Sequence, residues 1–203
     1  MLTKLKQKIQ QTLTAEAKAA HKIGLTPNMI SAIGITLAIL SALAYATWQN
    51  HPAYLLLATT LLLLSGFCDA LDGVVARLYQ QTTPFGGFLD SLLDRYADAA
   101  IYIGIIIGGL CDASWGLIAL TGSLLVSYSR ARAEAAGIKM ETIGLAERAE
   151  RIIILAIASP TAYFGQPTTV MNASIILLAI LTNLTVIQRT IYTYKKLKKK
   201  EKD

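Results

Sequence analysis

The sequence predicts an all-α membrane protein, with six transmembrane helices preceded by an N-terminal amphipathic helix at the membrane surface. Three observations predict this fold class. Of the 203 residues, 54% are hydrophobic and the mean hydropathy is +0.48, which is too apolar for an ordinary soluble domain. Apolar stretches recur along the chain, each near the roughly 20 residues that a bilayer core needs. The basic residues lie between and beyond these stretches.

The first element is the N-terminal segment, residues 2–22, which mixes basic and apolar residues. Leu2, Leu5, Ile9 and Leu13 fall on one helical stripe, which is typical of an amphipathic helix on an anionic membrane surface. A basic, solvated lead-in is the alternative. We expect no cleavable signal peptide, because the segment lacks an apolar core followed by a small-residue cleavage site.

A single domain is expected over residues 1–203, with a membrane body over 26–190 and a basic tail over 191–203. Thr26 and Pro27 open the body, because proline at a first helical turn costs no hydrogen bond and its neighbour can cap free amides. The six expected spans are residues 29–48, 54–79, 85–110, 115–135, 145–164 and 169–190.

Charge asymmetry predicts the orientation of the spans. Lys and Arg concentrate in the N-terminal segment, in and around the loop 137–144 and in the C-terminal tail, whereas the loops on the other side have none. The positive-inside rule therefore places both termini in the cytoplasm of a cell-membrane protein. The net charge of +6 is accordingly a topological signal, and we expect no nucleic-acid partner.

Four aspartates lie inside otherwise apolar sequence. Asp69 and Asp72 are three residues apart, and Asp90 and Asp94 are four apart, so each pair shares one face of a helix. Two helices joined near residues 80–85 would bring the pairs together. Four carboxylates repel one another in an apolar site, and an oxygen-only ligand set suits a hard divalent ion such as Mg²⁺ or Mn²⁺. One intramembrane aspartate can be a structural contact, but four at these spacings indicate function.

Gly73, Ala76 and Arg77 follow the first aspartate pair on the same helix. The small residues would let a ligand approach the backbone, or alternatively let another helix pack closely. The fork of Arg77 suits a diphosphate, although a snorkelling side chain is the alternative.

Arg130, Arg148, Arg151 and Arg189 all fall on the predicted cytoplasmic side. Gathered over the cavity, they would form an anion site for an acceptor that carries a phosphate, with Arg132 as a less central fifth arginine. The alternative is that they are topological charges in ion pairs with neighbouring carboxylates. Those carboxylates are Glu134, Glu147 and Glu150.

The acidic stretch resembles the signature of the CDP-alcohol phosphatidyltransferase family. Every fixed position of that signature is present, namely Asp69-x-x-Asp72-Gly73-x-x-Ala76-Arg77, then eight residues, then Gly86-x-x-x-Asp90-x-x-x-Asp94. The resemblance implies transfer between a CDP-linked lipid and an alcohol, with release of CMP. It also implies that Asp69, Asp72 and Asp90 hold the metal, with Asp94 completing the site and acting as the base.

The same resemblance implies a nucleotide pocket and a homodimer. The implied pocket residues are Thr26, Pro27, Asn28, Met29, Asp69, Gly73, Ala76, Arg77, Thr83 and Gly86.

Two further segments resemble the phosphatidylinositol-phosphate synthase branch, including archaeal relatives that use CDP-archaeol. They are Arg-Ala-Arg-Ala-Glu at the end of span four and Glu-Arg-Ala-Glu-Arg near the start of span five. The acceptor that this branch implies is inositol 1-phosphate. Arg130 stands where branch members can have Lys, which also binds phosphate but with a different geometry.

Two alternatives remain open from the sequence. The first is the same reaction with glycerol 3-phosphate, serine or free inositol as the acceptor. The second is a cation or proton transporter that uses intramembrane aspartates. Against a transporter, the acidic residues crowd near one face of the membrane, and the second half of the chain does not repeat the pattern.

Overall fold

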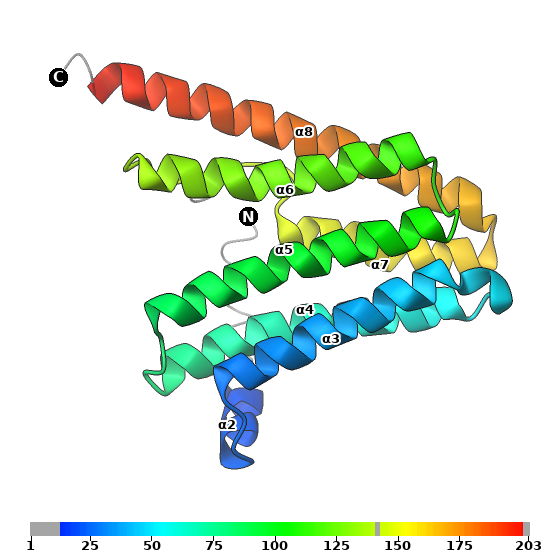
Figure 1. Ribbon diagram of the computed structural model, residues 1–203, viewed down its shortest axis with the longest axis horizontal. Helices are drawn as coiled ribbons and strands as arrows, with labels where there is room; N and C mark the ends of the chain where they lie inside the picture. Colours follow the sequence, from blue (N-terminus) through cyan, green and yellow to red (C-terminus); the bar gives the residue numbers. More distant parts are fainter. Residues whose placement is uncertain (1–12, 141–142, 201–203) are drawn as a thin grey trace.

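The structure is a computed structural model that describes residues 13–140 and 143–200 (Figure 1). The residues so described form seven α-helices and one short 3₁₀ helix, without a β-strand. The helices are α2 (Thr14–Lys22), α3 (Pro27–Ala46), α4 (Tyr54–Leu78), α5 (Pro84–Ile107), α6 (Ala113–Ala135), α7 (Arg148–Phe164) and α8 (Pro167–Lys200), with the 3₁₀ helix η1 (Trp48–Asn50) after α3.

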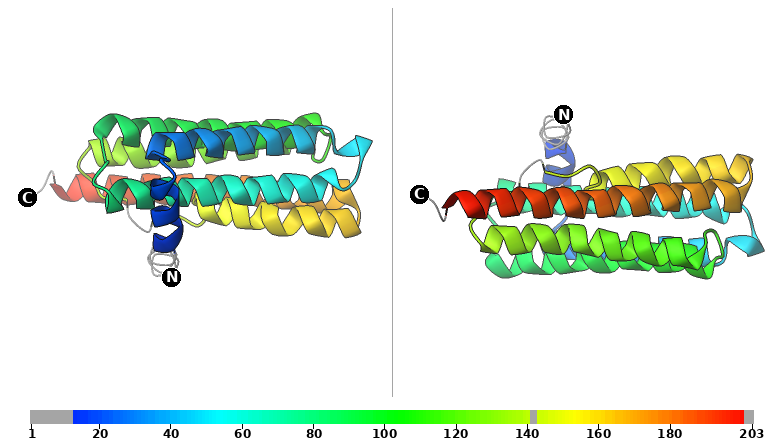
Figure 2. Two further views of the ribbon diagram at one scale, coloured as in Figure 1. Left: turned by 90° about the horizontal axis from the view of Figure 1, so that it is seen from below. Right: turned by 90° about the horizontal axis from the view of Figure 1, so that it is seen from above.

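The helices α3 to α8 run alongside one another in one elongated bundle, and α2 crosses the bundle at one end (Figures 1 and 2). Within the bundle α3 packs against α4 and α5, α6 packs against α8, and α7 contacts both α4 and α8. Because α4 and α5 both lie beside α3, the two helices that carry the aspartate pairs are held close together.

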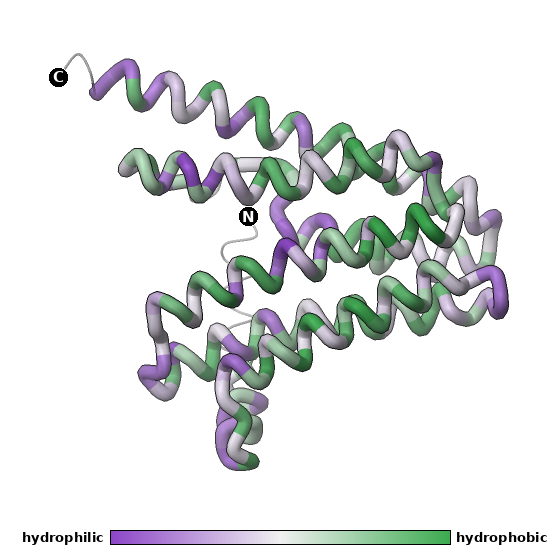
Figure 3. The backbone as a smooth tube through the Cα atoms, in the orientation of Figure 1, coloured by the Kyte–Doolittle hydropathy of each residue, from purple (hydrophilic) through white to green (hydrophobic). Residues whose placement is uncertain are grey.

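Three helices, α3, α4 and α8, are long and apolar enough to cross a membrane. Figure 3 shows hydrophobic residues along the helices and hydrophilic residues both at the ends of the bundle and partway along α5, near the start of α7. A membrane crossing by α5, α6 and α7 stays a prediction. Helix α5 carries Asp90, Asp94 and Asp98, and α7 has only 17 residues.

The helix ends lie within three residues of the expected spans, except for the end of α8. Helix α7, which corresponds to the fifth expected span, begins at Arg148 rather than residue 145, because the preceding residues form a loop that α8 holds in place. In that loop the amides of Leu145 and Ala146 both donate to Thr185 Oγ1, at 3.1 Å. The larger difference is at the C-terminus, where α8 continues as helix through residues 191–200 of the expected tail.

The described part of the N-terminal segment is the helix α2. Its Ala17 and Ala20 are buried in a small apolar cluster with Leu71 and Val75 of α4. His21 stacks on Tyr79 with the ring centroids 3.5 Å apart. The predicted stripe at Leu2, Leu5 and Ile9 lies outside the described residues, so the amphipathic surface helix stays a prediction.

The main apolar core joins all six helices α3 to α8 in the half of the bundle next to η1. Glycine permits the closest approach there, since a Cβ atom added to Gly104 of α5 would lie 2.2 Å from the Ala42 carbonyl oxygen of α3. The buried Tyr45 hydroxyl and Ser159 Oγ share a hydrogen bond of 2.6 Å. This tight half of the bundle fixes the positions of the polar half, where the aspartates lie.

Candidate active site

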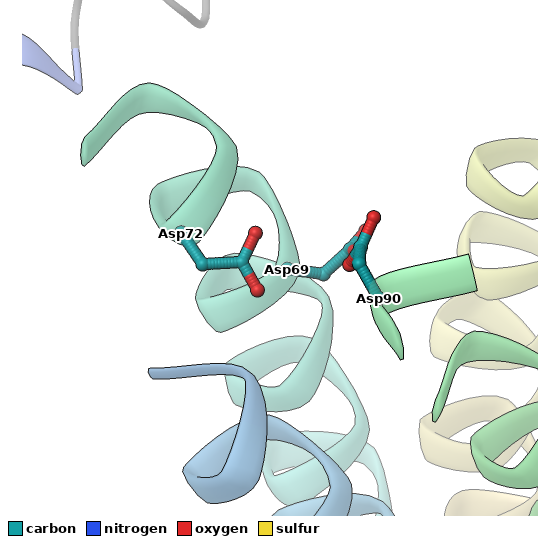
Figure 4. Close-up of side chains that lie close together, drawn as sticks. All are labelled: Asp69, Asp72 and Asp90. Carbon is teal, nitrogen blue, oxygen red and sulfur yellow. The ribbon is translucent and has the colours of Figure 1, made fainter. Parts of the chain in front are cut away.

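Three of the four predicted aspartates converge between α4 and α5. Figure 4 shows Asp69 and Asp72 on α4 and Asp90 on α5, and their carboxylates offer oxygen atoms that lie within 4.8 Å of one another. Asp72 is only 5% exposed, and it accepts a hydrogen bond of 2.5 Å from Ser31 Oγ of α3. The structure therefore brings together the residues that the sequence predicted as the main metal ligands.

Local sequence explains how Asp90 reaches Asp69 and Asp72. The chain reverses after α4 through Gln80, which has a left-handed φ of 54°. Thr83 then caps α5, with its side chain accepting from the Gly86 amide at 2.9 Å, and Pro84 fills the first helical position. The connection is short, so the start of α5 lies near the end of α4, and both helices pack against α3.

A cavity of about 20 Å³ lies at this point, lined by the carboxylates of Asp69, Asp72, Asp90 and Asp94 among others. That volume suits one water-sized occupant. Clustered carboxylates repel one another unless a cation balances them, and hard divalent cations prefer oxygen ligands. The donor set, the small cavity and the crowded negative charge therefore fit a divalent cation.

Arg148, the first residue of α7, enters the same cavity. Its Nη1 atom lies 2.8 Å from Asp69 Oδ2 and also hydrogen-bonds to the Asp94 carboxylate, while its Nε atom lies 3.4 Å from Asp98 Oδ1. Asp94 also lies 3.6 Å from Arg95. Asp94 thus shares the cavity with the three clustered aspartates, and its carboxylate forms ion pairs with Arg148 and Arg95.

Asp98 is a site residue that the sequence reasoning missed. Its carboxylate pairs with both Arg148 and Arg151, and Arg151 is 4% exposed. Arg151 Nη1 also donates to the Ala146 carbonyl at 3.0 Å. The sequence contains the pattern that indicates Asp98, because it follows Asp94 by four residues, as Asp94 follows Asp90. One face of α5 therefore carries three successive carboxylates.

The other two predicted acceptor arginines lie away from the cavity lining. Arg189 of α8 is 2% exposed and is fully engaged, donating to the carbonyls of Ile143 and Val126 and to Glu147 Oε1, at 2.7, 2.5 and 3.0 Å. Arg130 pairs with Glu134 at 2.9 Å on a half-exposed surface of α6. For these two arginines the ion-pair alternative therefore describes the observed contacts.

Glu150, the third carboxylate of that alternative, has no arginine partner among the described residues, and its Oε2 atom is buried without a hydrogen bond. Arg189 nevertheless lies near other arginines, because its partner Glu147 precedes Arg148 and its partner carbonyl at Val126 is one turn before Arg130. The arginines thus form one basic region, but only Arg148 and Arg151 of the predicted four contact the acidic site.

The predicted nucleotide residues include the starts of two helices. Thr26 caps α3 by accepting from the Met29 amide at 3.3 Å, with Pro27 at the first helical position, and Thr83 caps α5 in the same way. The two starts lie side by side, since a Cβ atom on Gly86 would be 3.9 Å from Asn28 Oδ1. Helix starts present free amides and positive potential, which favour anionic groups such as phosphates.

Gly73, Ala76 and Arg77 lie near the end of α4, on the side of the acidic cluster toward the α4–α5 turn. A Cβ atom on Gly73 would lie 3.2 Å from Arg77 Nη1, so the guanidinium folds back along its own helix over the glycine. Arg77 is exposed and makes no ion pair within the described residues. It is therefore available to an anionic ligand.

Comparison with known proteins places this geometry in context. A sequence model of the CDP-alcohol phosphatidyltransferase family matches residues 24–192. The archaetidylinositol phosphate synthase of Methanothermobacter thermautotrophicus is 46% identical over 179 residues, covering 88% of each chain. The enzyme of the same name from Pyrococcus horikoshii is 42% identical over 196 residues, covering 97% of each chain.

Solved structures of a bacterial protein match the fold. The phosphatidylinositol phosphate synthase of Mycobacterium tuberculosis with CDP-DAG bound has a TM-score of 0.77 and 27% identity, with 91% of this chain and 94% of the other covered. The same protein in complex with manganese and citrate has a TM-score of 0.77 and 28% identity, with 90% and 88% covered.

Proposed function

The chain belongs to the CDP-alcohol phosphatidyltransferase family, and from that membership we propose that it transfers the phosphatidyl or archaetidyl group of a CDP-linked lipid to a hydroxyl of inositol 1-phosphate, releasing CMP. One observation carries the proposal. The carboxylate cluster and the arginines Arg148 and Arg151 meet in a single site, linked by Asp94 and Asp98. The acidic part suits a metal-bound diphosphate, and the basic part suits an acceptor that bears a phosphate.

In the proposed reaction the acceptor hydroxyl oxygen forms a bond to the lipid-side phosphorus of the CDP-lipid. The bond from that phosphorus to the bridging oxygen breaks, and CMP leaves with this oxygen. Asp94 accepts the hydroxyl proton as the attack begins. Its contact with Arg148 holds the carboxylate in place beside the proposed acceptor site, as a base requires.

The metal ligands in this proposal are Asp69, Asp72 and Asp90, with Asp94 completing the site. When bound, Mg²⁺ or Mn²⁺ would neutralise the diphosphate and stabilise the charge that develops on its phosphoryl oxygens. The manganese complex of the Mycobacterium tuberculosis protein supports a divalent cation.

The nucleotide residues are proposed on the same basis. The paired starts of α3 and α5, with Thr26, Asn28 and Thr83, would face the CDP group, and Arg77 would contact its diphosphate. Gly73 and Ala76 would leave room for the ligand beside α4. Pro27, Met29, Asp69 and Gly86 complete the proposed pocket.

The acceptor is assigned by its phosphate. Arg148 contacts the proposed base and Arg151 contacts Asp98, one turn further along α5, and bidentate guanidinium groups suit a phosphate monoester. Arg130 and Arg189 would support this basic region from its rim. The names of the archaeal relatives favour inositol phosphate over glycerol 3-phosphate, serine or free inositol. Family membership favours an enzyme over the transporter alternative.

An assay of the purified protein tests the proposal. CDP-archaeol and CDP-diacylglycerol would each be offered with inositol 1-phosphate, glycerol 3-phosphate, serine or inositol, with and without Mg²⁺, and CMP release would be measured. We expect release that requires both the metal and inositol 1-phosphate. Equal rates of CMP release with glycerol 3-phosphate would contradict the assignment of inositol 1-phosphate as the acceptor. No CMP release with any pair of substrates would contradict the proposed transferase activity.

The arginine assignment has its own test within that assay. Arg148→Ala should raise KM for inositol 1-phosphate about 10- to 100-fold, because hydrogen bonds to charged groups contribute roughly 1.5–3 kcal/mol, while KM for the CDP-lipid changes far less. An equal rise for both substrates would mean that the arginine does not serve the acceptor. Arg132→Ala, on the exposed face of α6, is the matched control.

The membrane topology and the oligomeric state are also proposed. The distribution of Lys and Arg supports a cell-membrane protein with six spans and both termini in the cytoplasm. Family resemblance supports a homodimer, which the mass of the purified protein in detergent would test.

A further inference from the structure

A second cavity, lined by basic residues, lies at the C-terminal end of α8, apart from the acidic site. Its volume is about 270 Å³, against about 20 Å³ for the cavity among the aspartates, and the two cavities share no lining residue. The walls are the last turns of α8 and the turn that follows α6. Four lysines line it: Lys139, Lys196, Lys199 and Lys200.

Helix geometry explains why these lysines face one another. Lys199 and Lys200 follow Lys196 by three and four residues, so both lie on the same face of α8 as Lys196 and as Tyr192, one turn earlier. Gly137, in the left-handed region with a φ of 73°, turns the chain after α6 so that Lys139 joins the cavity from the other side.

Among the described residues, no carboxylate balances the positive charge of this cavity. No acidic residue lines it, and none of the four lysines forms a salt bridge within residues 13–140 and 143–200. Lys200 Nζ donates to the uncharged Gly137 carbonyl at 3.3 Å, and Lys196 Nζ lies 5.5 Å from the centre of the Tyr192 ring. Four ammonium groups around one hollow favour an anion, because an anion removes their mutual repulsion.

The position of the cavity indicates what kind of anion reaches it. Helix α8 has 34 residues. At 1.5 Å per residue it is about 50 Å long, so its last turns extend beyond a hydrocarbon core of about 30 Å into the headgroup layer. This end of α8 lies at the same end of the bundle as the α4–α5 turn (Figures 1 and 2), which is the proposed cytoplasmic end.

We propose that this cavity, the lysine pocket of Lys139, Lys196, Lys199 and Lys200, binds a phosphate group at the membrane surface. The headgroup of an anionic phospholipid fits the depth of the pocket, and a soluble phosphate ester has the same recognition chemistry. The volume is sufficient for a phosphate and part of its substituent. Tyr192, whose side chain carries a neutral hydroxyl donor, also lines the pocket.

The chain offers a matched control for this proposal. Lys195 and Lys198 lie on the same last turns of α8 but do not line the pocket. The double variants Lys196→Ala/Lys199→Ala and Lys195→Ala/Lys198→Ala remove the same charge from the same helix. The test is native mass spectrometry of the delipidated full chain in detergent, titrated with phosphatidylglycerol or with phosphatidylcholine.

We expect the wild-type protein to bind one phosphatidylglycerol in preference to phosphatidylcholine. Lys196→Ala/Lys199→Ala should weaken that binding about 10-fold or more, and the control pair should change it by about 2-fold or less, because only the lysines that line the pocket can donate charge-assisted hydrogen bonds to the phosphate. Equal weakening of phosphatidylglycerol binding in both double variants, or no preference for phosphatidylglycerol in the wild-type protein, would contradict the proposed phosphate site. Equal unfolding temperatures of the variants show that the fold is retained.

Inorganic phosphate distinguishes the two sources of the ligand. Displacement of phosphatidylglycerol from the wild-type protein by millimolar phosphate would assign the pocket to soluble phosphates as well as lipids. Binding that resists phosphate would assign it to the lipid headgroup. Both results support the proposed phosphate site if Lys196→Ala/Lys199→Ala loses phosphatidylglycerol binding and Lys195→Ala/Lys198→Ala retains it.

Discussion

Arg148 connects the acidic and basic parts of the site through one guanidinium group. It contacts Asp69, Asp94 and Asp98, and its side chain is 18% exposed. A charge at that depth is stable only with partners, and the carboxylates need a counter-charge for the same reason. A cation bound at Asp69 would compete with the guanidinium for the same oxygens. We therefore expect metal binding to free Arg148 for the acceptor phosphate.

Asp94 is the residue on which the chemistry depends most directly. Asp94→Asn should lower kcat by at least about 10²-fold, because a positioned general base contributes roughly 10²- to 10⁴-fold. Mg²⁺-dependent binding of the CDP-lipid should be largely spared, since Asp69, Asp72 and Asp90 remain. CMP release and equilibrium binding of labelled CDP-lipid measure the two effects. Near-normal turnover would remove Asp94 as the base.

Asp98 is predicted to position Arg148 and Arg151 for the acceptor. Asp98→Asn keeps the shape but weakens both ion pairs, so KM for inositol 1-phosphate should rise about 10-fold. KM for the CDP-lipid should be nearly unchanged, and Asp98→Glu should restore part of the loss. Steady-state kinetics with each substrate varied in turn would measure this difference.

The control for Asp98 is Asp112→Asn. Asp112 caps α6 at the other end of the bundle, where asparagine is an equally good cap, so neither KM should change. A fall in kcat with both KM values unchanged for Asp98→Asn would contradict the positioning role.

At the scale of elements, the pairing of α3 with α5 determines where Asp90, Asp94 and Asp98 lie. The two helices touch through Gly104, where an added Cβ would lie 2.2 Å from the backbone oxygen of Ala42. Backbone atoms cannot yield as a flexible side chain can. The helices would therefore have to separate, and the aspartates of α5 would move with them.

Gly104→Ala should lower stability by about 1–3 kcal/mol, as overpacking of a tight interface does. Gly87→Ala on the same helix is the matched control, because a Cβ there meets nothing within 4 Å. Alanine also favours a helix by about 1 kcal/mol over glycine, so this control should be neutral or stabilising. Unfolding temperatures in detergent compare the two variants. A Gly104→Ala protein as stable as the control would show that this contact is looser than described.

At the scale of the whole molecule, the polar site and the basic loops share one end of the bundle, as Figure 3 shows for the hydrophilic residues near the α4–α5 turn. Water-soluble acceptors and CMP must reach the aspartates from that end. The orientation of the bundle therefore decides from which side of the membrane the enzyme takes its acceptor.

Cysteine labelling tests this orientation. In a background with Cys68 and Cys111 replaced by serine, Asn50→Cys should react with a membrane-impermeant maleimide added to intact cells. Ala136→Cys should react only after the membrane is opened, because its loop lies on the positively charged side. Both positions are exposed in the structure. Labelling of position 136 alone in intact cells would reverse the proposed topology.

The helices themselves follow from local patterns. Apolar runs of bilayer length, the Thr-Pro starts at Thr26 and Thr83, and the spacing of the aspartates are properties of neighbouring residues, and the described helices agree with them closely. The family was equally readable, because its signature occupies one continuous stretch. Where local signals were weak, at the start of α7 and beyond residue 190, the expected boundaries differed from the described helices.

By itself, therefore, the sequence determined the all-helical class, the acidic motif and the family. Only the tertiary structure decided which arginines meet that motif. Arg148 and Arg151 reach it because α7 packs against α4. Arg130 and Arg189 had looked equivalent, but they pair instead with Glu134 and Glu147. Helical periodicity specifies the face on which a side chain lies, whereas its partners on distant helices depend on how the whole bundle packs.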